Sequence, residues 1–394
     1  MKRFRNSIAI QLSPLRVRAL FFALGSLVSC LAYAADAGAP ARSSVKYESV
    51  DKLIASEFSK SNGRALTVGI VERGGLVWSD SFGTSGKPGM SPATTHTVYA
   101  IQSVSKLVTG LMLLKLVDRG VVHLTDPVDR YVPEVQRIQN AFPWSPPVTL
   151  IQLATMISGI NGHWPSVHPE ANSWDENLLE VLPLLKFNFE PGTRREYSNI
   201  GYAILGLALS RAAHRTYAEY VQSEILHPLG MTDTGFSVSA TRLSRFAYPR
   251  EDATQQVSWT KDVLLPAGGI FTTLGDLAKL MRFQLGFGPE TVLSREVLEK
   301  SYRLVVSSDA ELQYGDGIGF SAVRSSDSNL TALGHGGHGY GFVASYEFDR
   351  SRGTGIILLT THDTNDYKPI VRKGLQILNP ESFGGTGLPP AEEH

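Results

Sequence analysis

The sequence predicts a mixed fold of the α/β (α+β) class, and three observations support this prediction. Hydrophobic residues make up 42% of the 394 residues and charged residues 19%, which is typical of globular proteins. Strand-like stretches lie toward both ends of the chain, whereas helical runs such as 177–182 and 202–213 occupy the region from about 141 to 260. A chain of this length exceeds what one core usually organises, so we expect an inserted lobe or a second domain.

The N-terminal region has the layout of a secretory signal. Five bases and no acid occur in the first 18 residues, and an apolar run extends from there to about residue 34. This run is shorter than the ~20 residues that a membrane-spanning helix needs, and small residues before Ala35 offer a cleavage site. We therefore expect a signal peptide at 1–34 and an exported protein, periplasmic or secreted. Alternatively, Leu27 to Cys30 resembles the lipobox of bacterial lipoproteins, which would anchor the protein to a membrane through a lipid on Cys30.

Cys30 is the only cysteine. An intramolecular disulfide, a cysteine-based zinc site and a catalytic thiol are therefore excluded from the mature domain. The whole chain is electrically balanced, so removal of the five leader bases leaves an excess of five acids. A mildly acidic chain without a basic run gives no indication of a nucleic-acid partner.

Local patterns predict the first elements of the fold. An Ala/Gly/Pro/Ser-rich linker at 35–45 precedes a helix that we expect at about 47–58. Strands at 65–71 and 76–82 form a hairpin, because the glycines between them tolerate the positive φ of a tight turn. Near the other end, alternating residues predict a strand at 343–348.

An apolar run at 103–114 predicts a buried helix with Ser103 and Lys106 at its start. These two residues are three positions apart and therefore lie one turn from each other. Free N–H groups at a helix start can stabilise an oxyanion, and a neighbouring amine can help to take the hydroxyl proton. The S-x-x-K pattern alone is a weak signal, because it also occurs at Ser43, Ser49 and Ser258.

Two further motifs carry chemistry. Tyr197-Ser198-Asn199 is the only Y-x-N sequence among the fourteen tyrosines, although a tyrosine packed in the core would be the simpler explanation of an isolated match. A glycine-rich stretch from Gly334 to Phe342 contains His335-Gly336-Gly337-His338. So much glycine before a strand indicates either backbone exposed to a ligand or a plain tight turn.

The three motifs, in this order, resemble those of the β-lactamase-related serine hydrolases, a group with class C β-lactamases, D,D-peptidases, D-aminopeptidases and family VIII esterases. Further matching stretches cover nearly all of the chain after the signal, among them 124–128, 148–159, 190–192, 228–231, 266–270 and 314–319. The resemblance implies a β-lactamase/transpeptidase-like fold, in which helices flank an antiparallel sheet built from both chain ends. It places the hydrolase domain at 46–140 and 261–380, an inserted, mostly helical lobe at 141–260, and a flexible tail at 381–394.

The resemblance also implies roles for individual residues. Ser103 would attack a carbonyl, Lys106 would polarise its hydroxyl, and Tyr197 would exchange protons with the nucleophile and the leaving group. Around them, Asn199 would bind the substrate or hold Lys106, the oxyanion hole would use the backbone N–H groups of Ser103 and His338, and His335 and Gly337 would line the substrate edge. Proton removal at neutral pH requires that burial or a neighbouring cation lowers the pKa of the amine, or that a neighbouring cation lowers that of the phenol.

The substrate class follows less directly. His335 stands where a typical β-lactamase has a lysine that pairs with the substrate carboxylate, which favours ester, amide or peptide cleavage over β-lactamase or D,D-carboxypeptidase activity. No cofactor or metal is expected, because no H-E-x-x-H is present, although His163 with His168 and His335 with His338 could be interpreted as metal ligands. A non-catalytic, penicillin-binding-like sensor or binding protein is the alternative from another class.

Overall fold

The computed structural model describes residues 45–60, 63–85, 91–160, 171–249, 257–303, 306–307, 314–324, 330–361 and 367–379. The predicted signal peptide with Cys30, the tail at 381–394 and the pair His163 and His168 lie outside the described residues, as does the linker except for its last residue.

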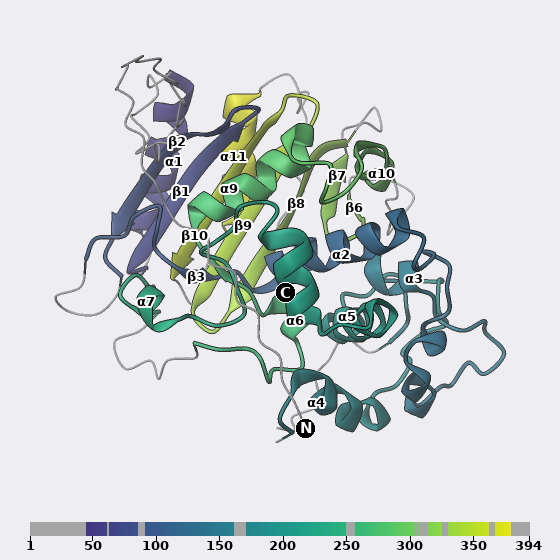
Figure 1. Ribbon diagram of the computed structural model, residues 1–394. Helices are drawn as coiled ribbons and strands as arrows, with labels where there is room; N and C mark the ends of the chain where they lie inside the picture. Colours follow the sequence, from purple (N-terminus) through teal and green to yellow (C-terminus); the bar gives the residue numbers. More distant parts are fainter. Residues whose placement is uncertain are drawn as a thin grey trace, which may run out of the picture. The chain divides into compact units, whose positions relative to one another are not determined.

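An eight-stranded antiparallel sheet is the central element of the fold (Figure 1). The strands follow one another across it in the order β2-β1-β10-β9-β8-β7-β6-β5. Strand β1 pairs with β10 in a register that places Val68 opposite Leu358, so the two ends of the chain build one sheet, as the resemblance implied. The strands are β1 (Ala65–Glu72), β2 (Gly75–Gly83), β5 (Val306–Ser307), β6 (Tyr314–Asp316), β7 (Ser321–Arg324), β8 (Leu330–Gly339), β9 (Phe342–Asp349) and β10 (Thr354–Thr361).

The sequence-based strand predictions are confirmed with small changes at the ends. The hairpin predicted at 65–71 and 76–82 is β1 and β2, joined by the two-residue turn Arg73-Gly74. The strand predicted at 343–348 is the middle of β9. Most of the glycine-rich stretch forms the end of β8, and only Tyr340 and Gly341 form the turn into β9.

Helices cover both faces of the sheet. On one face, α1 (Val45–Ser59) and α11 (Lys368–Leu378) pack together, and their apolar side chains form a core with β1 and β10. On the other face, α9 (Leu274–Arg282) crosses β1 and β10 (Figure 1). The helix predicted at 47–58 is therefore confirmed as part of α1.

The region between 141 and 260 contributes helices and isolated bridges among its described residues. Its longest helix, α5 (Asn199–Ala213), packs against α2 (Lys106–Asp118), and both belong to one apolar core that continues to the sheet. The chain just before Ser103 forms β3 (Tyr99–Ala100), which pairs with the short strand β4 (Phe271–Thr272). The remaining helices are α3 (Leu150–Ala154), α4 (Trp174–Val181), α6 (Tyr217–Val221), α7 (Ala240–Leu243), α8 (Leu265–Gly268) and α10 (Arg295–Ser301).

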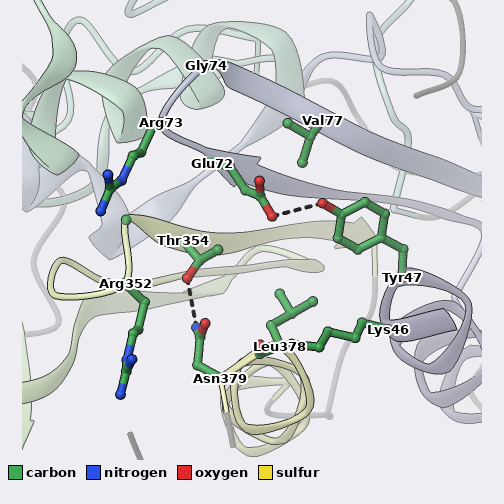
Figure 2. A pocket seen from close by; sticks show the side chains of 11 residues that line it. Lys46, Tyr47, Glu72, Arg73, Gly74, Val77, Arg352, Thr354, Leu378 and Asn379 are labelled. Carbon is green, nitrogen blue, oxygen red and sulfur yellow. Dashed lines mark hydrogen bonds between the residues drawn. The ribbon is translucent and has the colours of Figure 1, made fainter. Parts of the chain in front are cut away.

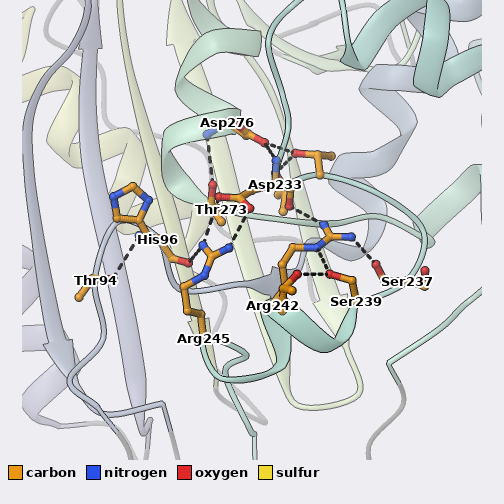
Figure 3. A network of polar contacts seen from close by, with 12 residues as sticks. Thr94, His96, Asp233, Ser237, Ser239, Arg242, Arg245, Thr273 and Asp276 are labelled. Atoms are coloured by element: carbon orange, nitrogen blue, oxygen red, sulfur yellow. Dashed lines mark hydrogen bonds and ion pairs between the residues drawn. The ribbon is translucent and has the colours of Figure 1, made fainter. Parts of the chain in front are cut away.

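A polar network fastens the chain just before β3 to the segments around α7 and α9 (Figure 3). Arg245 donates to the carbonyl oxygen of His96 at 2.8 Å and forms an ion pair with Asp233 at 2.8 Å. The buried carboxylate of Asp276 accepts hydrogen bonds from the backbone N–H of Asp233 and from the hydroxyl of Thr234. These contacts connect the segment that leads into β3 with the segments around α7 and α9.

A pocket of about 380 Å³ lies at one end of the sheet, between the β1–β2 turn and the start of β10 (Figure 2). The hydroxyl of Tyr47 donates to Glu72 at 2.8 Å, and the amide of Asn379 donates to Thr354 at 2.7 Å. Thr354 pairs with the last residue of β9, whereas the turn at Tyr340 precedes the first residue of β9. This pocket is therefore at the opposite end of β9 from the glycine-rich end of β8. Among the helices that the structure describes, none combines the length and apolar character required to cross a membrane.

Candidate active site

Ser103 lies in a single 3-10 turn, Gln102–Ser105, that leads directly into α2. The buried helix predicted at 103–114 is thus confirmed, with its first residues wound more tightly and its end extended to Asp118. The residues of α2 from Lys106 to Leu116 are all buried, which explains the apolar run in the sequence. Ser103 itself remains partly exposed, as a nucleophile must be to reach a substrate.

Lys106 is fully buried and reaches back along the helix to Ser103. Its Nζ atom lies 3.0 Å from Ser103 Oγ, 2.7 Å from Asn199 Oδ1 and 2.9 Å from the carbonyl oxygen of Ala267. The last two atoms can only accept hydrogen bonds, so they take two amine protons. The third bonding direction of the Lys106 nitrogen, which in a neutral amine is the lone pair, points at the serine hydroxyl.

Tyr197 reaches the same oxygen from a distant part of the chain. Its hydroxyl donates to Ser103 Oγ at 2.8 Å, although the two residues are 94 positions apart. The next residue, Ser198, caps α5 by accepting from the N–H of Gly201 at 2.9 Å. This cap fixes the start of α5, so that Tyr197 lies just outside the helix and Asn199 is its first residue.

Burial affects the two proton-carrying groups in opposite directions. It holds the pKa of Lys106 well below the ordinary value of 10.5, because an ammonium without water is disfavoured. It raises the pKa of Tyr197, and the Asp316 carboxylate adds to this effect, while Ser103 and Arg195 oppose it. The requirement for a lowered pKa is therefore met by the amine. The phenol does not meet it in the free protein, because burial outweighs the neighbouring charges.

Strand β8 packs closely against the turn that carries Ser103. A side-chain carbon at Gly337 would lie 2.1 Å from the carbonyl oxygen of Ile101, so only glycine permits this approach. Gly337 is buried and faces Ile101, and the next residue, His338, is exposed. The arrangement brings the β8 backbone alongside the nucleophile turn, where the predicted oxyanion donors, the N–H groups of Ser103 and His338, belong to neighbouring segments.

His335 faces Tyr197, with 6.2 Å between the ring centroids. Burial lowers its pKa far below the usual 6.5, and the charges of Lys106 and Lys368 contribute to the lowering. Its Nδ1 atom lies 2.5 Å from the carbonyl oxygen of Gly336, a contact in which the ring N–H donates. The imidazole is consequently neutral and offers Nε2 as an acceptor.

The structure does not bring His335 and His338 together as metal ligands. They are three residues apart on a strand, so their side chains point to opposite faces. In the described part of the chain, no group of three or more His, Cys, Asp or Glu side chains is arranged around a metal position.

Sequence reasoning missed four residues next to the site. Ala267 contributes through its backbone carbonyl, which no side-chain pattern reveals. Asp316 accepts from Arg195 Nε at 2.6 Å, and both residues act on the pKa of Tyr197. Gln102 precedes the nucleophile with a φ of 47°, and its buried Nε2 atom has no hydrogen-bond partner among the residues that the structure describes. For Arg195, its position two residues before Tyr197 could have indicated that it lies near the site.

The chain matches the family model described as Beta-lactamase over residues 50–376. This protein belongs to the beta-lactamase family. The match includes Ser103, Lys106, Tyr197 and the whole glycine-rich stretch of β8.

Relatives of this beta-lactamase family member include several kinds of protein. "Beta-lactamase-like protein 2" of Dictyostelium discoideum is 27% identical over 68% of this chain and 51% of its own length. "D-alanyl-D-alanine-carboxypeptidase/endopeptidase AmpH" of Escherichia coli K12 is 30% identical over 47% of this chain and 48% of its own length. The chain thus spans about half the length of these curated relatives.

Solved structures show that the fold is β-lactamase/transpeptidase-like, as predicted. A class C β-lactamase superposes with a TM-score of 0.71 at 20% identity, over 84% of this chain and 96% of that one. The octameric penicillin-binding protein homologue from Pyrococcus abyssi gives 0.70 at 22% identity, over 84% and 77%. At such identities these similarities concern the fold alone.

Proposed function

We propose that this member of the beta-lactamase family is an exported serine hydrolase that cleaves ester or amide bonds through an acyl-enzyme on Ser103. The observation that carries the proposal is the double contact at Ser103 Oγ, with the Lys106 amine at 3.0 Å and the Tyr197 hydroxyl at 2.8 Å. Export rests on the basic and apolar leader at 1–34, and Cys30 offers a lipid anchor as the alternative to release.

Acylation begins with the neutral amine. With two amine protons donated to Asn199 and Ala267, the Lys106 lone pair accepts the proton of Ser103 as Oγ attacks the substrate carbonyl. The negative charge that develops on the carbonyl oxygen is stabilised by the N–H groups of Ser103 and His338. The bond to the leaving group then breaks, and the leaving group takes the Tyr197 hydroxyl proton.

The raised pKa of Tyr197 suits this order of events. In the free protein the phenol keeps its proton, because burial raises its pKa. Once Lys106 has accepted the serine proton, an ammonium lies 4.9 Å from the Tyr197 ring centroid and stabilises the phenolate that forms. The Lys106 cation beside the phenol thus arises only during turnover.

Deacylation reverses the proton transfers. Water gives a proton to the Tyr197 phenolate and attacks the acyl carbon, and Ser103 Oγ takes a proton from the Lys106 ammonium as it leaves. One water is consumed, the acid product is released, and both residues return to their neutral forms. These acylation and deacylation steps need no metal or cofactor.

The neutral His335 favours substrates without a carboxylate beside the scissile bond. A D,D-carboxypeptidase or β-lactamase activity remains the second candidate, because AmpH and the Burkholderia cenocepacia "D-alanine Carboxypeptidase AmpC" are similar in sequence or fold. A non-catalytic sensor is the third candidate. Such a protein would have no chemical need for an amine and a phenol that both contact one serine hydroxyl.

Two measurements test these alternatives. A fluorophosphonate should label the wild type and fail to label Ser103→Ala; an unlabelled wild type would favour the binding protein. Steady-state kinetics with aryl esters, D-amino-acid amides, D-Ala-D-Ala peptides and a chromogenic cephalosporin then rank the hydrolytic activities. Efficient turnover of the cephalosporin alone would contradict the ordering based on His335.

A further inference from the structure

The turn between β8 and β9 holds Tyr340 in a conformation that its side chain disfavours. The turn has two residues, Tyr340 with a φ of 53° and Gly341 with a φ of 78°. Such turns prefer asparagine, aspartate or glycine at the first position, because larger side chains crowd the backbone there. A tyrosine at a strained position is a reason to look for a function of its ring.

The ring of Tyr340 is exposed and supported from beneath. The residue is 63% exposed, whereas Trp259, whose ring centroid lies 4.8 Å away, is only 3% exposed. Trp259 in turn stacks on Phe271 of β4, with 5.9 Å between centroids and 18° between ring planes. Tyr340 is therefore the accessible end of a row of aromatic rings that is anchored in the core.

This ring lies beside the proposed catalytic residues. A side-chain carbon at Gly339, the residue before Tyr340, would lie 3.4 Å from Oε1 of Gln102, which directly precedes Ser103. Residues in a strand advance by about 3.3 Å each, so the Cα atom of Tyr340 lies within roughly 7 Å of that of His338. A substrate held at Ser103 and His338 thus has an exposed aromatic ring within reach of its side group.

We propose that Tyr340, supported by Trp259, is a specificity-determining residue that stacks on a planar aromatic group of the substrate. This inference rests on the proposed hydrolytic function and names its substrate class. Ring pairs in offset or tilted contact gain free energy beyond the burial of area, whereas an alkyl chain gains only the burial. The site should therefore prefer an aryl substrate over an alkyl substrate of similar size.

The preference can be measured with two matched substrate pairs that lack any other ring. Ethyl phenylacetate and ethyl hexanoate place the difference in the acyl group, and benzyl acetate and hexyl acetate place it in the leaving group. We expect the wild type to favour the aryl member of one pair about tenfold in kcat/KM, the size of a ring contact. Tyr340→Asn should bring that ratio close to one, and Tyr340→Phe should retain it.

Trp144→Ala is the matched control, because Trp144 is 70% exposed and also contacts one aromatic ring, that of Phe142. It should leave the aryl-to-alkyl ratio unchanged. Labelling by an alkyl fluorophosphonate, which has no ring, separates the two proposals. An unlabelled wild type would remove the hydrolase proposal and this inference with it. Intact labelling, with equal aryl-to-alkyl ratios in the wild type and in folded Tyr340→Asn, would overturn the inference alone.

Discussion

The Nζ atom of Lys106 lies 3.0 Å from Oγ of Ser103, and its other two partners are acceptors from segments far away in the chain. An amine so placed acts as a base only when it is neutral, which burial favours. We expect Lys106→Met to lower kcat by roughly 10²- to 10⁴-fold, the usual contribution of a general base, with the fold intact. Steady-state kinetics and circular dichroism check this, and near wild-type kcat would refute the assigned role.

Tyr197→Phe removes only the hydroxyl oxygen that contacts Ser103 Oγ. The ring keeps its packing, so we expect the unfolding midpoint to change little while kcat falls by roughly 10²-fold or more. The fall should be smaller for esters with acidic leaving groups, because these depart without a proton. Equal losses for good and poor leaving groups would argue against a proton-donating Tyr197.

The pH dependence of the reaction follows from Lys106. Its pKa in the folded protein lies below 10.5, and activity needs the neutral amine, so kcat/KM should fall as the pH drops through that lowered value. The unfolded chain binds more protons at Lys106 between the lowered and the ordinary pKa, so this residue makes stability rise with pH across that interval. Chemical denaturation of the wild type and Lys106→Met at several pH values should show that difference, and parallel curves would contradict it.

Gly337→Ala tests the close approach of β8 to the nucleophile turn. The new carbon would lie 2.1 Å from the carbonyl oxygen of Ile101, so backbone must move, at a cost of about 1–3 kcal/mol. Activity should fall more than stability suggests, because the movement separates Ser103 from His338. Gly74→Ala is the control, since nothing lies within 4 Å of its added carbon. Thermal unfolding and labelling rates measure both, and equal behaviour of the two variants would count against the role of Gly337.

His335→Lys should change which substrates are accepted. An ammonium at this edge would pair with a substrate carboxylate, so we expect kcat/KM for D-Ala-D-Ala peptides to rise relative to that for neutral esters. The added cation also lies near Lys106 and Lys368, so overall rates should drop. A ratio unchanged from the wild type would show that His335 does not face the substrate.

The residues of the candidate site were largely predictable, because short motifs in a fixed order carry that information. Ser103, Lys106 and Tyr197 converge on one oxygen as expected. Their protonation states were not predictable, since these depend on burial and on neighbouring charges that the chain assembles from distant segments. Arg195 and Asp316, which are 121 positions apart, illustrate this.

The amino-acid sequence by itself determined the elements: an apolar run specifies α2, alternation specifies β9, and glycines specify the β1–β2 hairpin. Only the tertiary structure decided that β1 pairs with β10 and that Ala267 turns its carbonyl to Lys106. The tertiary structure also decided that burial raises the pKa of the Tyr197 phenol and lowers that of the Lys106 amine. The physical reason is that local propensity acts between neighbours in the chain, whereas burial and electrostatic interactions act between neighbours in space.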